Sequence, residues 1–219
     1  MFDSSAAFRV FLDEVTPAME KAGLKRVASK FVLRRAHARS EIVFRKSRAT
    51  TRGRLIFGID AEVLLPKLDQ FFRNKNHNEN IPAGDCEFCM DQRGLVPSDS
   101  LGYWDVDAEE QILGVASVAI GCIPRAMIFF ERFETEEMVV RELSSVLLMT
   151  GSASLNEQLK YPAYLAALGD VGGFVQALDA IETKFRDNES AMARFVRFSA
   201  ILTEFAFGVD GKSGLQAQK

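Results

Sequence analysis

The sequence predicts an α+β fold with an N-terminal helix, a four-stranded antiparallel sheet and an all-helical C-terminal half. Three observations support this prediction. Apolar residues first recur at helical spacing, the period changes to two from Lys30 onward, and helical patterns return after Trp104. We expect two domains, an α+β core over residues 1–150 and a helical extension over residues 151–219 that packs on the core.

The opening segment is expected to form a helix with one apolar face. Ser4 or Ser5 can cap its start, and Gly23 is a plausible stop. Pro17 lies inside the pattern and is expected to kink or split the helix, because proline removes a helical hydrogen bond. The apolar face consists of Phe8, Phe11, Leu12, Val15 and Met19.

Strand patterns follow this helix. Three segments alternate between apolar and polar residues, namely SKFVLRR, SEIVFRKS and RLIFGIDAEV. Their Phe, Leu and Ile side chains then share one face, and most of their cations lie on the other. Short strands with short connections favour an antiparallel meander. A fourth strand is expected at about CEFCMDQRGLV, after a helical or irregular passage and a polar loop.

The remainder of the chain reads as helices separated by polar breaks. The first is expected to run from the cap Asp107 to about Gly121, and a further short helical stretch should follow Pro124. The last helix is expected to end near Gly208. The caps expected for the later helices are Thr135, Ser154 in a capping box with Glu157, Asp170, and Asp187 or Asn188.

Charge is distributed unevenly, although the net charge is only −3. Residues 21–54 carry +11 and residues 55–219 carry −11. We predict a non-enzymatic interaction protein that binds an acidic protein partner through a basic sheet face including Arg34, Arg45 and Arg54. Binding of a nucleic acid or another anionic ligand is one alternative. Neutralisation of the cations by the acidic half of the same chain is another.

An ordered series of features resembles a known family. The series comprises Pro17, Gly23-Leu24-Lys25, Cys86, Arg93-Gly94-Leu95 and Tyr103-Trp104. Over about residues 5–148 it is similar to the bacterial family catalogued as domain of unknown function 4304. Leu24 stands where that family usually has an aromatic residue, and the helices beyond residue 150 match poorly. The resemblance implies an α+β fold and no assigned activity.

The cysteines and histidines do not form a recognisable catalytic or metal-binding motif. Cys86 and Cys89 share a predicted strand, where side chains three residues apart point to opposite faces, and no helix start follows them. His37 and His77 have no nucleophile at a recognisable spacing. We therefore predict reduced thiols, no catalytic residue, no metal site and no cofactor.

A third hypothesis is an enzyme that acts on a small anionic substrate. Arg93 lies beside a glycine and could contact an anion, while Tyr103 and Trp104 could anchor a ligand if exposed. The alternatives are an ion pair of Arg93 with an aspartate and a core position for the two aromatic residues.

Composition and the N-terminus indicate a cytoplasmic globular protein. The chain has 219 residues, of which 47% are hydrophobic, so it can fill a core. The start lacks the pattern of a signal peptide. The longest apolar run, residues 112–123, is too short to cross a membrane, and three cysteines fit a reducing compartment.

Overall fold

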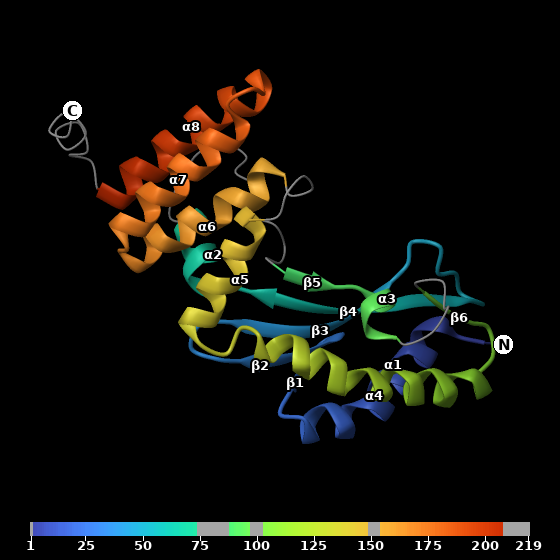
Figure 1. The fold of residues 1–219 in the computed structure, drawn as a ribbon. Coiled ribbons are helices and arrows are strands. Elements are labelled where there is room, and N and C mark those ends of the chain that lie inside the picture. The colour runs from blue at the N-terminus through green and yellow to red at the C-terminus, as the bar shows by residue number, and fades with distance from the viewer. Residues whose placement is uncertain (1, 74–87, 97–102, 149–153, 208–219) are drawn as a thin grey trace, which may run out of the picture. The chain divides into compact units, whose positions relative to one another are not determined.

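The computed structural model describes residues 2–73, 88–96, 103–148 and 154–207 (Figure 1). The chain forms two compact units. Unit 1 comprises Met1–Leu65 and Asp85–Glu134, and unit 2 comprises Pro66–Gly84 and Thr135–Lys219. The domain boundary predicted at residue 150 falls outside the described residues.

Unit 1 is built on an antiparallel sheet of six strands, where the sequence predicts four. The first five pair in chain order, and β6 pairs with β4 beside β5, at residues 55–57 instead of 61–63. The meander is confirmed, whereas the strand number was wrong because β1 and β6 are too short to show alternation. The strands are β1 (Lys25–Val27), β2 (Lys30–Arg34), β3 (Arg39–Lys46), β4 (Leu55–Leu64), β5 (Phe88–Met90) and β6 (Trp104–Val106).

Two long helices, α1 (Ser4–Lys21) and α4 (Glu110–Glu131), lie on the same side of this sheet (Figure 1). Their core is aromatic: the Phe11 ring lies 4.7 Å from the Phe57 ring and 4.9 Å from the Phe44 ring. The strand register puts the predicted apolar residues of β2–β4 on this helix-covered face. The opposite face, which carries most of the strand cations, is called the polar face below.

Both long helices continue where breaks were predicted. Pro17 does not split α1, and α4 passes through Gly121 and Pro124 without a break. Each proline removes one helical hydrogen bond, and the exposed glycine costs about 1 kcal/mol. Burial of the apolar side chains on the opposite face of each helix outweighs these costs. The N-cap of α1 is Asp3, not a serine, because its carboxylate accepts the N–H groups of Ser5 and Ala6.

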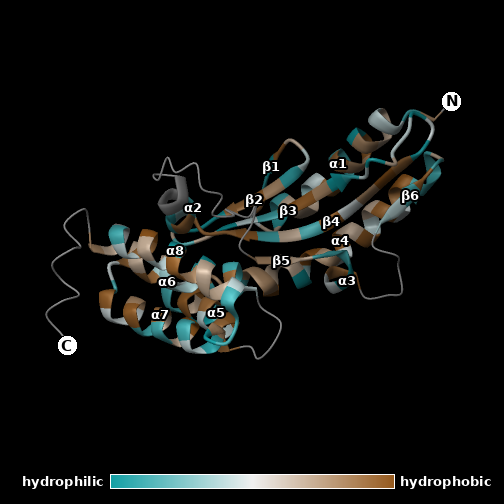
Figure 2. Cartoon of the chain, turned by 90° about the horizontal axis from the view of Figure 1, so that it is seen from above, coloured by the Kyte–Doolittle hydropathy of each residue, from teal (hydrophilic) through white to brown (hydrophobic). Residues whose placement is uncertain are grey.

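Unit 2 is helical. Hydrophobic and hydrophilic residues are interspersed along each of the helices α5–α8, as is typical of amphipathic helices in a bundle (Figure 2). The helix α6 contacts the other four helices and places Tyr164 in the core. The predicted caps Thr135, Ser154, Asp170 and Asn188 all accept backbone N–H groups. The helices are α2 (Pro66–Arg73), α5 (Glu136–Leu148), α6 (Leu155–Leu168), α7 (Val171–Phe185) and α8 (Glu189–Phe207).

Among the described residues, α4 is the one helix long and apolar enough to cross a membrane. Core helices of soluble proteins meet the same criterion, and α4 buries Ile112, Cys122 and Phe130 in unit 1. One such helix is only weak evidence for a membrane span.

Candidate functional site

Two buried carboxylates on the polar face of the sheet are paired with cations. Glu41 of β3 and Glu62 of β4 lie opposite each other and are only 3% and 5% exposed. Glu41 pairs with Lys30 Nζ at 2.8 Å and with Arg39 Nε at 2.9 Å. Buried carboxylates need such partners because desolvating an unpaired charge is costly. The charges of Lys30 and Arg39 are therefore neutralised by a carboxylate of the same chain.

Arg45 pairs with the second buried carboxylate. Its guanidinium donates to Glu62 and, through Nε at 3.1 Å, to Asp60. The hydrogen bond to Glu62 raises the pKa of Arg45, whereas burial raises the pKa of Asp60 against the opposing effect of Arg45. Arg45, predicted as a partner-binding residue, is thus held by two carboxylates of β4.

The other two predicted sheet arginines differ from each other. Arg54 Nε donates to Asp105 Oδ1 at 2.8 Å, and a second nitrogen donates to the other oxygen of the same carboxylate. This fork-like contact lowers the pKa of Asp105. Arg34, at the end of β2, is exposed and forms no ion pair with any carboxylate in the part of the chain that is described.

The structure separates Arg93, Tyr103 and Trp104. Arg93 belongs to the short helix α3 (Gln92–Leu95), and its side chain is 83% exposed, with Nε 3.9 Å from Asp91 Oδ2. Tyr103 is exposed, but the neighbouring Trp104 is buried, with its ring 5.3 Å from that of Phe57. Trp104 therefore belongs to the core, and the two aromatic residues do not form one binding surface.

Cations without carboxylate partners gather instead at the turn between β3 and β4. Lys46, Arg48 and Arg52 are exposed, and within residues 2–73, 88–96, 103–148 and 154–207 no carboxylate pairs with them. Lys46 Nζ lies 4.5 Å from the centre of the Phe8 ring. Arg9 and Arg52 both lower the pKa of Asp3, after the larger effect of its hydrogen bonds from Ser5 and Ala6. We call Arg9, Lys46, Arg48 and Arg52 the basic end of unit 1.

Backbone hydrogen bonds hold the turn that carries these cations. Ser47 N–H donates to Ile56 O at 2.8 Å, and Thr51 N–H donates to Arg54 O at 2.8 Å. The Thr50 hydroxyl accepts the Ile56 N–H and donates to the Ile56 carbonyl. Ser4 N–H, at the start of α1, donates to Arg52 O at 3.2 Å. Arg48 and Arg52 therefore lie on a turn whose backbone is held by hydrogen bonds.

Arg48 and Arg52 were not predicted as binding residues, because the prediction rested on strand alternation and these two arginines lie in the turn. The signal was present in the segment RKSRATTRGR, residues 45–54, which contains five cations and no acid. Turn positions extend beyond the sheet, so their side chains are less often neutralised by neighbouring strands.

The thiols and imidazoles that the structure describes show no convergent arrangement. Cys89 is exposed on β5, Cys122 is buried in α4 with its thiol pKa raised by burial, and Cys86 lies outside the described residues. His37 is half-buried and His77 is also outside the described part. In the portion that is described, no three His, Cys, Asp or Glu side chains lie together as metal ligands would.

No family model, curated protein or solved structure matches this chain. The resemblance to domain of unknown function 4304 stays an expectation. The fold and the site together define an α+β protein with a charge-paired sheet face and a basic end.

Proposed function

We propose that the protein is a non-enzymatic interaction protein that binds an acidic protein partner through its basic end. One contrast carries this proposal. The cations beside Glu41 and Glu62 on the polar face have carboxylate partners, whereas the cations of the basic end form no ion pair with a carboxylate among the described residues. Exposed, unneutralised cations attract an acidic surface and accelerate its association. We place this interaction in the cytoplasm.

An acidic protein fits this surface better than a nucleic acid does. Single-strand binders combine cations with exposed aromatic rings on which bases stack. Phe8, Phe44 and Phe57, on the elements that form the basic end, are buried. A cluster of four cations also offers fewer phosphate contacts than the six to ten that give strong, salt-dependent duplex binding.

The test is charge reversal with a matched control. The variant Arg48→Glu/Arg52→Glu removes two cations of the basic end, and Arg34→Glu/Arg141→Glu makes the same charge change at two other exposed arginines. Fluorescence anisotropy with labelled poly-L-glutamate and with single-stranded DNA, over a range of salt concentrations, measures the binding. We expect the affinity of Arg48→Glu/Arg52→Glu for poly-L-glutamate to fall roughly tenfold. The affinity of the control variant should fall by less than about fivefold.

Two results would count against the proposal. Equal losses in both variants would mean that only net charge matters. Tighter binding to DNA than to poly-L-glutamate, lost in the Arg48→Glu/Arg52→Glu variant, would assign the basic end to nucleic acid instead.

A further inference from the structure

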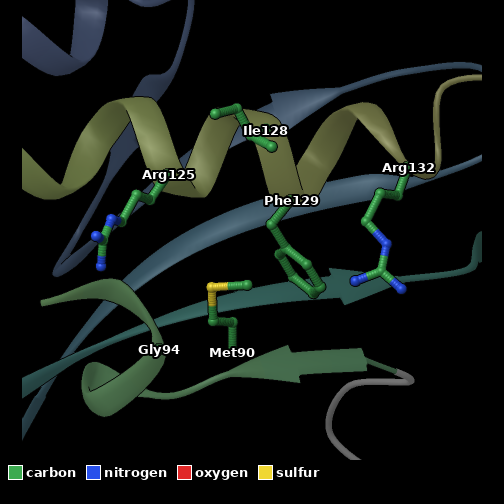
Figure 3. A pocket seen from close by; sticks show the side chains of 6 residues that line it. All are labelled: Met90, Gly94, Arg125, Ile128, Phe129 and Arg132. Carbon is green, nitrogen blue, oxygen red and sulfur yellow. The ribbon is translucent and has the colours of Figure 1, made fainter. Parts of the chain in front are cut away.

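A second candidate site in unit 1 is a shallow pocket of about 240 Å³ against the C-terminal half of α4. It is contributed by three elements, α3, α4 and β5, and it contains none of the residues of the basic end. The lining residues are Met90, Gly94, Arg125, Ile128, Phe129 and Arg132 (Figure 3).

The pocket has an apolar floor between two guanidinium groups. Figure 3 shows the Phe129 ring and the Met90 thioether between Arg125 on one side and Arg132 on the other. Arg125 lies on α4 and Arg132 is the C-cap residue of that helix, so the two are seven residues apart, or roughly 10 Å along the helix axis. Phe129 is itself fixed, because its ring packs 5.5 Å from that of Phe133.

The floor is fixed from the side of α3 as well. A Cβ atom at Gly94 would lie 2.7 Å from Met90 Cγ, a distance that non-bonded atoms do not adopt. Glycine therefore lets α3 approach the Met90 side chain. A larger residue at position 94 would force the Met90 side chain to shift.

Arg125 supplies the charge of the site. It is exposed, and none of the carboxylates in the described ranges pairs with it. Arg132, at the other side of the pocket, lies over the face of Phe129 at 5.9 Å. Ile128 is 64% exposed, so an apolar side chain stands beside the cations at the rim.

We propose that this pocket binds a small free carboxylic acid that carries a flat or branched apolar group. The apolar group would rest on Phe129, Met90 and Ile128, and the carboxylate would accept a fork of two hydrogen bonds from Arg125. The volume corresponds to about eight water molecules at roughly 30 Å³ each, which is enough for one ring with a substituent. A second acidic group on the far side of the ring would face Arg132.

Calorimetric titration of the full chain with four probes tests the site. Benzoate contains both required groups, terephthalate adds a second carboxylate, acetate lacks the ring and benzyl alcohol lacks the charge. We expect saturable benzoate binding in the millimolar range, tighter binding of terephthalate, and at least tenfold weaker binding of acetate and benzyl alcohol.

Variants locate the binding. Arg125→Met keeps an apolar chain but removes the charge, and we expect it to weaken benzoate binding about tenfold, whereas Arg141→Met in unit 2 should bind as the parent does. The Arg48→Glu/Arg52→Glu variant should also keep benzoate affinity, which separates this inference from the proposed function. An absence of saturable benzoate binding, unchanged affinity in Arg125→Met, or equal affinity for benzyl alcohol would each overturn the assignment.

Discussion

Removing Arg45 should destabilise the protein through the two carboxylates that it holds. The Glu62 side chain is only 6% exposed and that of Asp60 is 24% exposed, while Arg45 itself is half exposed. Breaking a buried ion pair costs about 3–5 kcal/mol and an exposed pair about 0–1 kcal/mol. Because water reaches the arginine, we take the lower end for Glu62 and expect Arg45→Met to lose about 3 kcal/mol.

Urea unfolding followed by circular dichroism measures this loss as a change in the free energy of unfolding at constant m-value. Arg34→Met is the control, since Arg34 lies on the same face without an ion pair in the described residues and should cost less than about 0.5 kcal/mol. Replacing Glu62 by Gln in the Arg45→Met background should recover part of the stability, because the unpaired buried charge is removed.

The pH dependence follows from Asp60. Burial already raises the pKa of this carboxyl, and Arg45 opposes the rise, so Arg45→Met should raise it further. An acid whose pKa is higher in the folded state favours folding below its unfolded pKa, and that advantage is lost as the pH rises through the folded pKa. The defect of Arg45→Met should therefore grow from acidic pH toward neutral. A loss below about 1 kcal/mol at pH 7, or one equal to that of Arg34→Met, would refute this reasoning.

Three further predictions concern unit 2. Tyr164 is fully buried, its hydroxyl has no hydrogen-bond partner in the described structure, and its pKa is raised to about 12, chiefly by burial. Tyr164→Phe should thus unfold at equal or higher urea concentration at pH 7, and between pH 10 and 12 it should avoid a loss of stability that the parent shows. Gly169→Ala should cost about 1 kcal/mol in thermal unfolding, because Gly169 ends α6 with φ +76°. Ser154→Ala should cost about 1 kcal/mol by the same assay, because it removes the capping box of α6.

Much of the fold was predictable because it depends on local patterns. Alternation in β2–β4 identified the helix-covered face, and capping residues marked the starts of α5–α8. The errors arose where tertiary packing overrides a local signal. Gly121 and Pro124 read as a helix break, but residues on both sides of them are buried in one core, so α4 continues.

The candidate site was harder to predict because pairing depends on strand register. The sequence shows a run of cations, but only the register places Glu41 opposite Glu62 and brings Arg45 to both carboxylates of β4. The pocket on α4 was not predicted at all. Its residues come from β5, α3 and α4, and Arg125 and Arg132 carry no signal that distinguishes them from other surface arginines.

The position of the basic end follows from where β4 carries its acids. Asp60 and Glu62 lie in the second half of that strand, whereas its first half, Leu55–Ile59, contains none. Arg45 pairs with both of these acids, and Asp105 of β6 pairs with Arg54. Lys46 lies opposite Phe57 at the end of β3, Arg48 and Arg52 follow in the turn, and none of the three forms an ion pair with a carboxylate of the described strands. An acidic partner would supply the carboxylates that the first half of β4 lacks.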